Sequence, residues 1–228
     1  MVTKIQPQTY NFYHIYNRGV DKRVIFEDNS DYIRFIHLLY VCNDSEIKLK
    51  NTTRFLKNTH EQGQPLLIQR EGERLVEIIC YCLMPNHYHL ALKQLIKDGI
   101  PRFMHKLATA YTMAFNIKHE RSGRLFEGPY KLRFINSENY LLYLSKYIHL
   151  NPIKFLEPQW KERGIQNWRL VNNFLESFRW SSYLDYIGIK NFPSIINKRV
   201  MSEFYKTPEV YKDFINQYLI TDFQYIIL

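Results

Sequence analysis

The spacing of hydrophobic residues changes along the first part of the chain, and each spacing predicts a type of element. Runs rich in β-favouring residues, which suit strands, occupy residues 10–19, 76–92 and 130–135. Apolar residues at helical spacing occupy residues 31–41, 101–118 and 138–150. The last of these helices has Ser137 as its expected N-cap and ends before Pro152, because proline disfavours helical geometry in the preceding residue. The order β-α-β-β-α-β-α is typical of an α+β fold with a mainly antiparallel sheet.

The pattern changes after Pro158, where the chain becomes rich in tryptophan and mostly helical. Candidate helices in this part are residues 181–187 and 208–219. We therefore predict a globular unit over residues 1–155 and a mainly helical C-terminal extension over residues 156–228. The polar segment 43–65 has little periodicity and is expected to be a long loop.

The two β-favouring runs within residues 76–92 are joined by Pro85-Asn86, a dipeptide typical of a tight turn, so they predict a β-hairpin. Side chains alternate across a strand, so His87 and His89 share one face and Tyr88 points to the other. Two imidazoles side by side can hold one metal ion. Two polar residues on a solvated hairpin face fit the same pattern, so the histidine pair alone leaves both interpretations open.

A second metal hypothesis combines the histidine pair with Cys80 and Cys82, which together could form a tetrahedral zinc site. The register of the hairpin decides whether these side chains can meet. A three-residue turn places the cysteines on the face opposite the histidines, whereas a two-residue turn at Pro85-Asn86 pairs Cys82 with His89 on one face. The sequence leaves both registers open, and buried cysteines are also common as ordinary core residues.

The helix predicted over residues 138–150 carries a further candidate pair. Tyr147 and Asn151 are four residues apart and therefore share a face of the helix. This face differs from the apolar stripe of the helix, so Tyr147 need not belong to the core. An amide oxygen of Asn151 could complete a metal site begun by two imidazoles, with the Tyr147 hydroxyl one helical turn away. An aromatic residue that packs and an asparagine that ends the helix fit the spacing equally well.

Composition and charge narrow the class of protein. The 228 residues are 46% hydrophobic, 16% aromatic and 23% charged, and the net charge of +9 indicates a polyanionic partner. Lysine and arginine beside aromatic rings suit single-stranded nucleic acid, which offers phosphates and bases that stack. No glycine-rich phosphate-binding motif occurs, so the sequence gives no sign of a nucleotide cofactor. Three cysteines form no disulfide framework, and no run is long enough to span a membrane, so we expect a cytoplasmic protein without a membrane partner.

Four motifs in order make a family resemblance specific. They are Tyr13-His14-Ile15-Tyr16-Asn17-Arg18-Gly19, Met84-Pro85-Asn86-His87-Tyr88-His89, Gly123-Arg124-Leu125-Phe126-Glu127-Gly128-Pro129-Tyr130-Lys131 and Tyr147-Ile148-His149-Leu150-Asn151-Pro152-Ile153. Together they resemble the REP-associated tyrosine transposases, which belong to the single-tyrosine HUH transposases (His, bulky hydrophobic residue, His). The resemblance covers roughly residues 8–155, with Tyr88 as the bulky middle residue.

The resemblance implies a ferredoxin-like antiparallel sheet with helices on one side, the histidines on a central strand and the nucleophile on a helix. It implies that His87, His89 and Asn151 bind Mg²⁺ or Mn²⁺ and that Tyr147 attacks a phosphate of single-stranded DNA at hairpin-containing sequences. The product is a 5′-phosphotyrosine link and a free 3′-hydroxyl, formed without ATP. Tyr111, in another family-like segment, is a competing nucleophile, but the position four residues after it is Phe115, which cannot bind a metal.

Basic residues near these motifs are expected to contact the DNA, namely Arg18, Arg121, Arg124 and Lys131. The main hypothesis is therefore a DNA-strand transesterase that acts as a monomer or a dimer. One alternative is a non-catalytic protein that binds single-stranded nucleic acid on the same fold, which needs the basic charge but not Tyr147. The other is a structural zinc protein built on Cys80, Cys82, His87 and His89.

Overall fold

Four strands form one antiparallel sheet in the computed structural model, which describes residues 6–47 and 71–217. The strands are β1 (Phe12–Arg18), β2 (Val76–Met84), β3 (His87–Gln94) and β4 (Lys131–Ile135), in the spatial order β2-β3-β1-β4. The α+β fold with a ferredoxin-like antiparallel sheet, expected from the sequence, is thus confirmed. The loop expected over residues 43–65 falls mostly outside the described residues.

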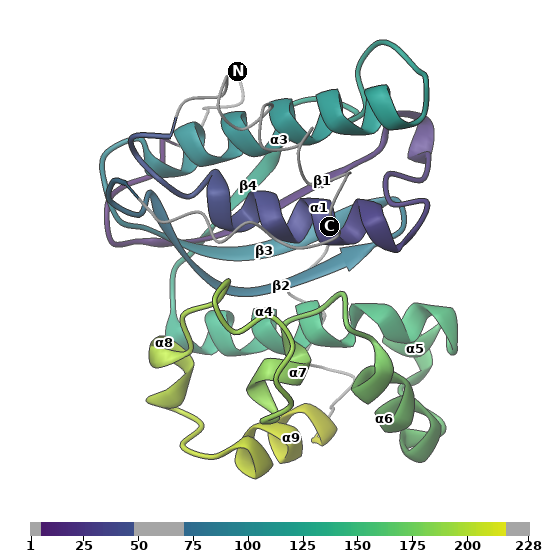
Figure 1. Cartoon of the computed structure of the whole chain (residues 1–228). Coiled ribbons are helices and arrows are strands. Elements are labelled where there is room, and N and C mark those ends of the chain that lie inside the picture. Colours follow the sequence, from purple (N-terminus) through teal and green to yellow (C-terminus); the bar gives the residue numbers. More distant parts are fainter. Residues whose placement is uncertain (1–5, 48–70, 218–228) are drawn as a thin grey trace.

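Two helices, α1 (Asn29–Val41) and α3 (Gly99–Lys118), cover one face of the sheet (Figure 1). Helix α1 begins at a capping box, in which Asp28 accepts hydrogen bonds from the backbone N–H groups of Ser30 and Asp31. Phe35 of α1 packs against Tyr88 of β3 and Tyr111 of α3, with ring centroids 5.1 and 4.9 Å apart. This aromatic cluster fixes which face of β3 is turned toward the two helices.

Helix α4 (Glu138–Leu150) lies on the opposite face of the sheet, between the strands and the C-terminal part of the chain (Figure 1). Ser137 caps it, as expected, by accepting a hydrogen bond from the Tyr140 N–H. Tyr147 is only 1% exposed, although its helical face differs from the apolar stripe. Its ring lies between His14 and His89 of the sheet and Lys161 of the C-terminal part of the chain.

The C-terminal part attaches to the free edge of β2 and to α4. After η2 (Asn151–Phe155), its elements are α5 (Trp160–Arg163), α6 (Trp168–Ser177), α7 (Tyr183–Tyr186), α8 (Arg199–Ser202) and α9 (Pro208–Asn216). Backbone hydrogen bonds join Leu83 to Trp180 and Ser182 to Tyr81. The buried His149 ring contacts Ser182 Oγ at 2.7 Å and the Tyr211 hydroxyl at 2.6 Å, so one side chain of α4 links two segments of this part.

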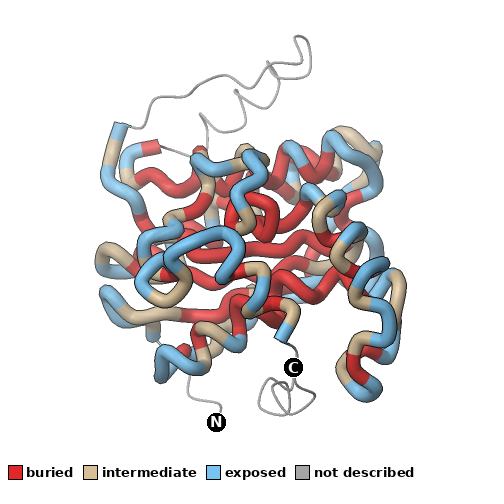
Figure 2. Tube along the Cα trace, turned by 90° about the horizontal axis from the view of Figure 1, so that it is seen from below, coloured by how far each residue is buried: buried red, intermediate tan, exposed pale blue. Residues whose placement is uncertain are grey.

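The predicted elements of residues 1–155 are present with small shifts at their ends, and a short η1 (Val20–Lys22) follows β1. Helix α6 was missed, although Asn167 caps it and Val171 and Leu175 lie one turn apart. Figure 2 shows the buried stretches gathered in the sheet and against it, with exposed residues mainly in the connections. No helix within residues 6–47 and 71–217 is both long and apolar enough to cross a membrane.

Candidate active site

The histidine pair lies at the start of β3, on the face of the sheet that α4 covers. The hairpin has the two-residue turn at Pro85-Asn86, because Met84 pairs with His87 and Cys82 with His89. The rings of His87 and His89 are 5.2 Å apart and perpendicular, and His89 is buried. Tyr88 points to the other face, as the alternation predicts.

Both histidines use Nδ1 in hydrogen bonds, so Nε2 is the nitrogen of each ring left to act as a ligand. His87 Nδ1 lies 2.6 Å from Asn86 Oδ1, and because that oxygen can only accept, His87 Nδ1 carries the proton. His89 Nδ1 lies 3.0 Å from Nε2 of His14 on the neighbouring strand β1. When His89 donates in this contact, its buried Nε2, which has no hydrogen-bond partner among the described residues, presents a lone pair.

The environment keeps these imidazoles neutral. Burial, with Lys154 as the next cause, lowers the pKa of His87 to about 4. Burial and then the neighbouring His14 hold the pKa of His89 well below its ordinary value. Burial and then Arg133 lower the pKa of His14 to about 3. Neutral imidazole is the form that binds a metal, so the protonation state suits a ligand role.

Helix α4 brings Tyr147 and Asn151 to the histidines from the opposite side of the site. The Tyr147 ring is 5.5 Å from that of His89 and nearly perpendicular to it. Burial raises the pKa of the Tyr147 hydroxyl, and a hydrogen-bonding interaction with the Asn151 side chain lowers it. The Asn151 side chain also interacts with His87, whose protonated form it favours. Tyr147 and Asn151, expected together from helical spacing, therefore meet His87 and His89, expected together from strand alternation, in one buried site.

The residues fit a divalent metal by the chemistry of their donor atoms. The two neutral imidazoles each have Nδ1 in a hydrogen bond, and Nε2 of His89 has no partner among the described residues. The Asn151 side chain interacts with His87, and its amide oxygen is a ligand that Mg²⁺ and Mn²⁺ accept. Hydrogen bonds at Nδ1 are the usual way in which proteins orient histidine ligands.

The four-residue zinc site is not assembled. The register does place Cys82 opposite His89, but Cys80 and Cys82 are free, fully buried core residues. Burial raises the pKa of both thiols, which disfavours the thiolate that zinc requires. Within the described part of the chain, no three or more His, Cys, Asp or Glu side chains gather around a metal position.

Tyr111, the competing nucleophile, lies in the other layer. Its hydroxyl donates to the backbone carbonyl of Ile25, and its ring packs against Phe35 and Phe126. These contacts lie on the face of the sheet that α1 and α3 cover, opposite the histidines. The structure therefore brings Tyr147, and not Tyr111, next to His89.

The four predicted DNA-contacting residues separate into two groups. Arg18 is paired with His87 in the sheet register and forms an exposed ion pair with Glu127, and Lys131 lies 5.8 Å from the ring of Tyr16 beside the site. Arg121 instead contacts Asn116 and the carbonyl of Arg124 beyond the end of α3, on the other layer. The structure thus brings Arg18 and Lys131 toward the histidines and places Arg121 and Arg124 away from them.

Two site residues were missed by the sequence analysis. His14 stands in the Tyr13-His14-Ile15-Tyr16 motif, and its alternation with Tyr16 was a signal that it faces the same side as His89 once β1 and β3 pair. Lys161 lies in α5, and its Nζ donates a hydrogen bond to the Tyr147 hydroxyl at 3.1 Å. Nothing in its sequence neighbourhood marks it, because the contact joins residues that lie on different helices.

Residues 47–151 match the family model described as "Transposase IS200 like". No curated protein matches the chain. A solved structure described as a REP-associated tyrosine transposase bound to a REP hairpin is similar, with a TM-score of 0.49 and 11% identity over 84% of this chain and 88% of that chain. The family match includes the histidine pair and Tyr147 and ends at Asn151.

Proposed function

We propose that the chain cleaves and rejoins single-stranded DNA with Tyr147 as the nucleophile, a proposal supported by the match of residues 47–151 to the family model of IS200-like transposases. The observation that carries the proposal is the meeting of α4 with β3. The Tyr147 ring lies 5.5 Å from that of His89, and the Asn151 side chain interacts with both Tyr147 and His87. We further propose that residues 1–155 form the catalytic unit and residues 156–228 an extension.

The proposed reaction is a transesterification. Tyr147 Oη attacks the scissile phosphorus, the new O–P bond gives a 5′-phosphotyrosine, and the bond from phosphorus to the 3′-oxygen breaks. The phenol proton is lost and the departing 3′-oxygen gains one, so the step needs no further reactant. A 3′-hydroxyl can reverse the step and rejoin the strand, because the phosphoester bond is exchanged and not hydrolysed.

We propose His87, His89 and Asn151 as ligands of a Mg²⁺ or Mn²⁺ ion. When bound, a divalent ion supplies Lewis-acid polarisation of a phosphate oxygen. His14 fixes the ring of His89 through Nδ1, and Asn86 does the same for His87. The sheet supplies the rigidity, since His14 and His89 belong to its two central strands.

Single-stranded DNA that forms a hairpin is the proposed substrate, as the family chemistry implies. The net charge of +9 favours a polyanion. Arg18 and Lys131 lie closest to the site among the predicted contacts, and Lys131 beside the Tyr16 ring offers a cation next to an aromatic surface on which a base can stack.

The test is a covalent adduct on a denaturing gel. End-labelled single-stranded hairpin DNA is incubated with the protein and Mn²⁺ or Mg²⁺, and a slower band marks the phosphotyrosine. We expect Tyr147→Phe and EDTA to abolish the band. Tyr111→Phe is the matched control, which should keep the adduct although it removes one buried hydrogen bond.

Each other outcome overturns a part of the proposal. An adduct that survives Tyr147→Phe but not Tyr111→Phe moves the nucleophile. Tight binding of the hairpin with no adduct under any metal condition supports a non-catalytic nucleic-acid-binding protein. An adduct that still forms in EDTA after dialysis would show that the reaction needs no metal ion.

A further inference from the structure

Lys161 contacts the proposed nucleophile from a part of the chain that the family match does not cover. The match ends at residue 151, whereas Lys161 belongs to α5 in the C-terminal part. Its Nζ donates to the Tyr147 hydroxyl at 3.1 Å and lies 4.4 Å from the centre of the Tyr147 ring. One ammonium group therefore touches both the reacting oxygen and the face of the ring that carries it.

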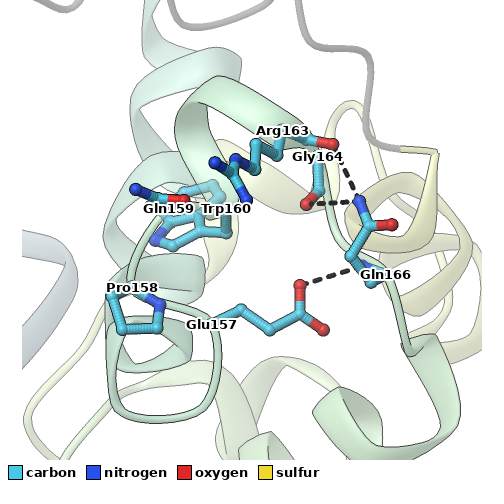
Figure 3. A pocket seen from close by; sticks show the side chains of 7 residues that line it. All are labelled: Glu157, Pro158, Gln159, Trp160, Arg163, Gly164 and Gln166. Carbon is cyan, nitrogen blue, oxygen red and sulfur yellow. Dashed lines mark hydrogen bonds between the residues drawn. The ribbon is translucent and has the colours of Figure 1, made fainter.

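The local structure holds Lys161 in this place although α5 has only four residues. The neighbouring Trp160 is 1% exposed and anchors the helix in the core. Figure 3 shows the loop closing around it, with Gln166 Nε2 donating to the carbonyls of Arg163 and Gly164 and the Glu157 carboxylate accepting from the Gln166 N–H. Glu157 also accepts from the Asn167 N–H, so a single carboxylate closes the segment that presents Lys161.

The surroundings of Lys161 disfavour its charge. Burial is the main cause that lowers the pKa of its ammonium, to about 8, and nearby Lys154 adds to the effect. Lys161 in turn lowers the pKa of His87 and His89, so its charge acts across the whole site. A half-buried lysine beside Lys154, with only the smaller opposing effect of Glu162, is unfavourable for folding, which argues for a role other than stability.

We propose that Lys161 is a positioning residue for Tyr147, which fixes the direction of its hydroxyl and stabilises the negative charge that Oη carries once its proton is lost and before the O–P bond is complete. This inference rests on the proposed function, since it needs Tyr147 to be the nucleophile. Lys161 gives up no proton in the step. The same charge stabilises Oη as the leaving group when the strand is rejoined.

A consequence is that the C-terminal extension completes the active site. The transposase-like unit supplies the histidines, Tyr147 and Asn151, while the extension supplies the cation that faces Oη. Preorganised charge near an atom that becomes negative contributes most where water is excluded, and Tyr147 is almost fully buried.

The experiment measures single-turnover adduct formation at several DNA concentrations for the wild type and for Lys161→Met, Lys161→Arg and Lys206→Met. Methionine keeps the apolar stem without the charge, and arginine keeps the charge. Lys206 is an exposed lysine of the same extension and serves as the matched control. The probe is labelled hairpin DNA with Mn²⁺, and binding is followed in parallel by fluorescence anisotropy.

We expect Lys161→Met to lower the maximal rate about 100-fold, as the loss of one preorganised donor does elsewhere, with the apparent affinity for DNA changed less than about threefold. Lys161→Arg should keep roughly a tenth or more of the wild-type maximal rate. Lys206→Met should have the same rate as the wild type. A normal maximal rate in Lys161→Met overturns the inference, and so does a defect that saturating DNA removes, because the lysine then only binds DNA. Absence of any adduct in the wild type instead refutes the proposed function.

Discussion

Replacing Lys161 with methionine should make the protein more stable while it loses activity. In the folded protein, burial and then Lys154 lower the pKa of Lys161 from 10.5 to about 8. At pH 7 a fall of this size corresponds to an upper bound of roughly 3 kcal/mol against folding. The side chain is only partly buried and its ammonium gains from the Tyr147 hydroxyl and ring, so we expect Lys161→Met to raise the free energy of unfolding by about 1–2 kcal/mol.

The gain should depend on pH in a defined direction. A folded-state pKa below the unfolded-state value means that the folded protein binds its proton less tightly, so the unfavourable contribution is complete below pH 8. It decreases as the pH rises from about 8 through 10.5, and above that pH Lys161 is neutral in both states. The advantage of the methionine variant at pH 7 should therefore fall by about half at pH 9.5.

Urea-induced unfolding followed by tryptophan fluorescence at pH 7.0, 8.5 and 9.5 measures both effects. Lys206→Met, an exposed change of the same kind in the extension, should lie within about 0.5 kcal/mol of the wild type at each pH. Destabilisation of Lys161→Met by more than about 1 kcal/mol would refute the reasoning, because Lys161 would then serve mainly to hold the extension to α4.

Two further changes test the supports of the site and of the fold. His14→Gln removes the ring that orients His89 through Nδ1, so the Mn²⁺ concentration for half-maximal adduct formation should rise about 10–100-fold, and an unchanged midpoint would exclude this role. Asp44→Ala should lower the free energy of unfolding by about 2–4 kcal/mol in urea, since four backbone N–H groups, one in a buried and three in partly buried hydrogen bonds, lose their acceptor. Burial raises the pKa of the Asp44 carboxyl, but these hydrogen bonds outweigh burial and hold the pKa below 3.8. The stability advantage of the wild type over Asp44→Ala should therefore disappear only below about pH 4. Loss of this advantage near neutral pH would contradict the account.

Local patterns were sufficient for the elements of residues 1–155. Alternation along β3 determined that His87 and His89 share a face, and a capping serine with a following proline bounded α4. Helical spacing determined that Tyr147 and Asn151 lie together. These relations follow from backbone geometry within one element, so the sequence contains them without knowledge of the rest of the fold.

The hairpin register shows where local information ends. Both the two-residue and the three-residue turn keep the histidines together, and the alternation of β3 satisfies either one. The pairing of Met84 with His87 is selected by the tertiary structure, in which β2 must also present Cys82 to the layer of α4 and Tyr88 must reach Phe35. A slip by one residue would turn every side chain of one strand to the wrong face.

The burial of Tyr147 and the contact with Lys161 were decided by packing alone. The spacing of apolar residues in α4 indicates one buried stripe, but the helix is covered on two sides, by the sheet and by the C-terminal extension. No periodicity in α5, a helix of four residues, predicts that its lysine meets a tyrosine fourteen positions earlier.

The sequence by itself therefore determined the parts of the site. These are two imidazoles on one strand, and a tyrosine and an amide on one turn of a helix. The tertiary structure decided that these parts face each other, that His14 supports His89, and that Lys161 lies against the Tyr147 hydroxyl. The reason is physical. Backbone geometry sets the face of a side chain over a few residues, whereas the partner that it meets depends on which distant surfaces lower the free energy most when they are buried together.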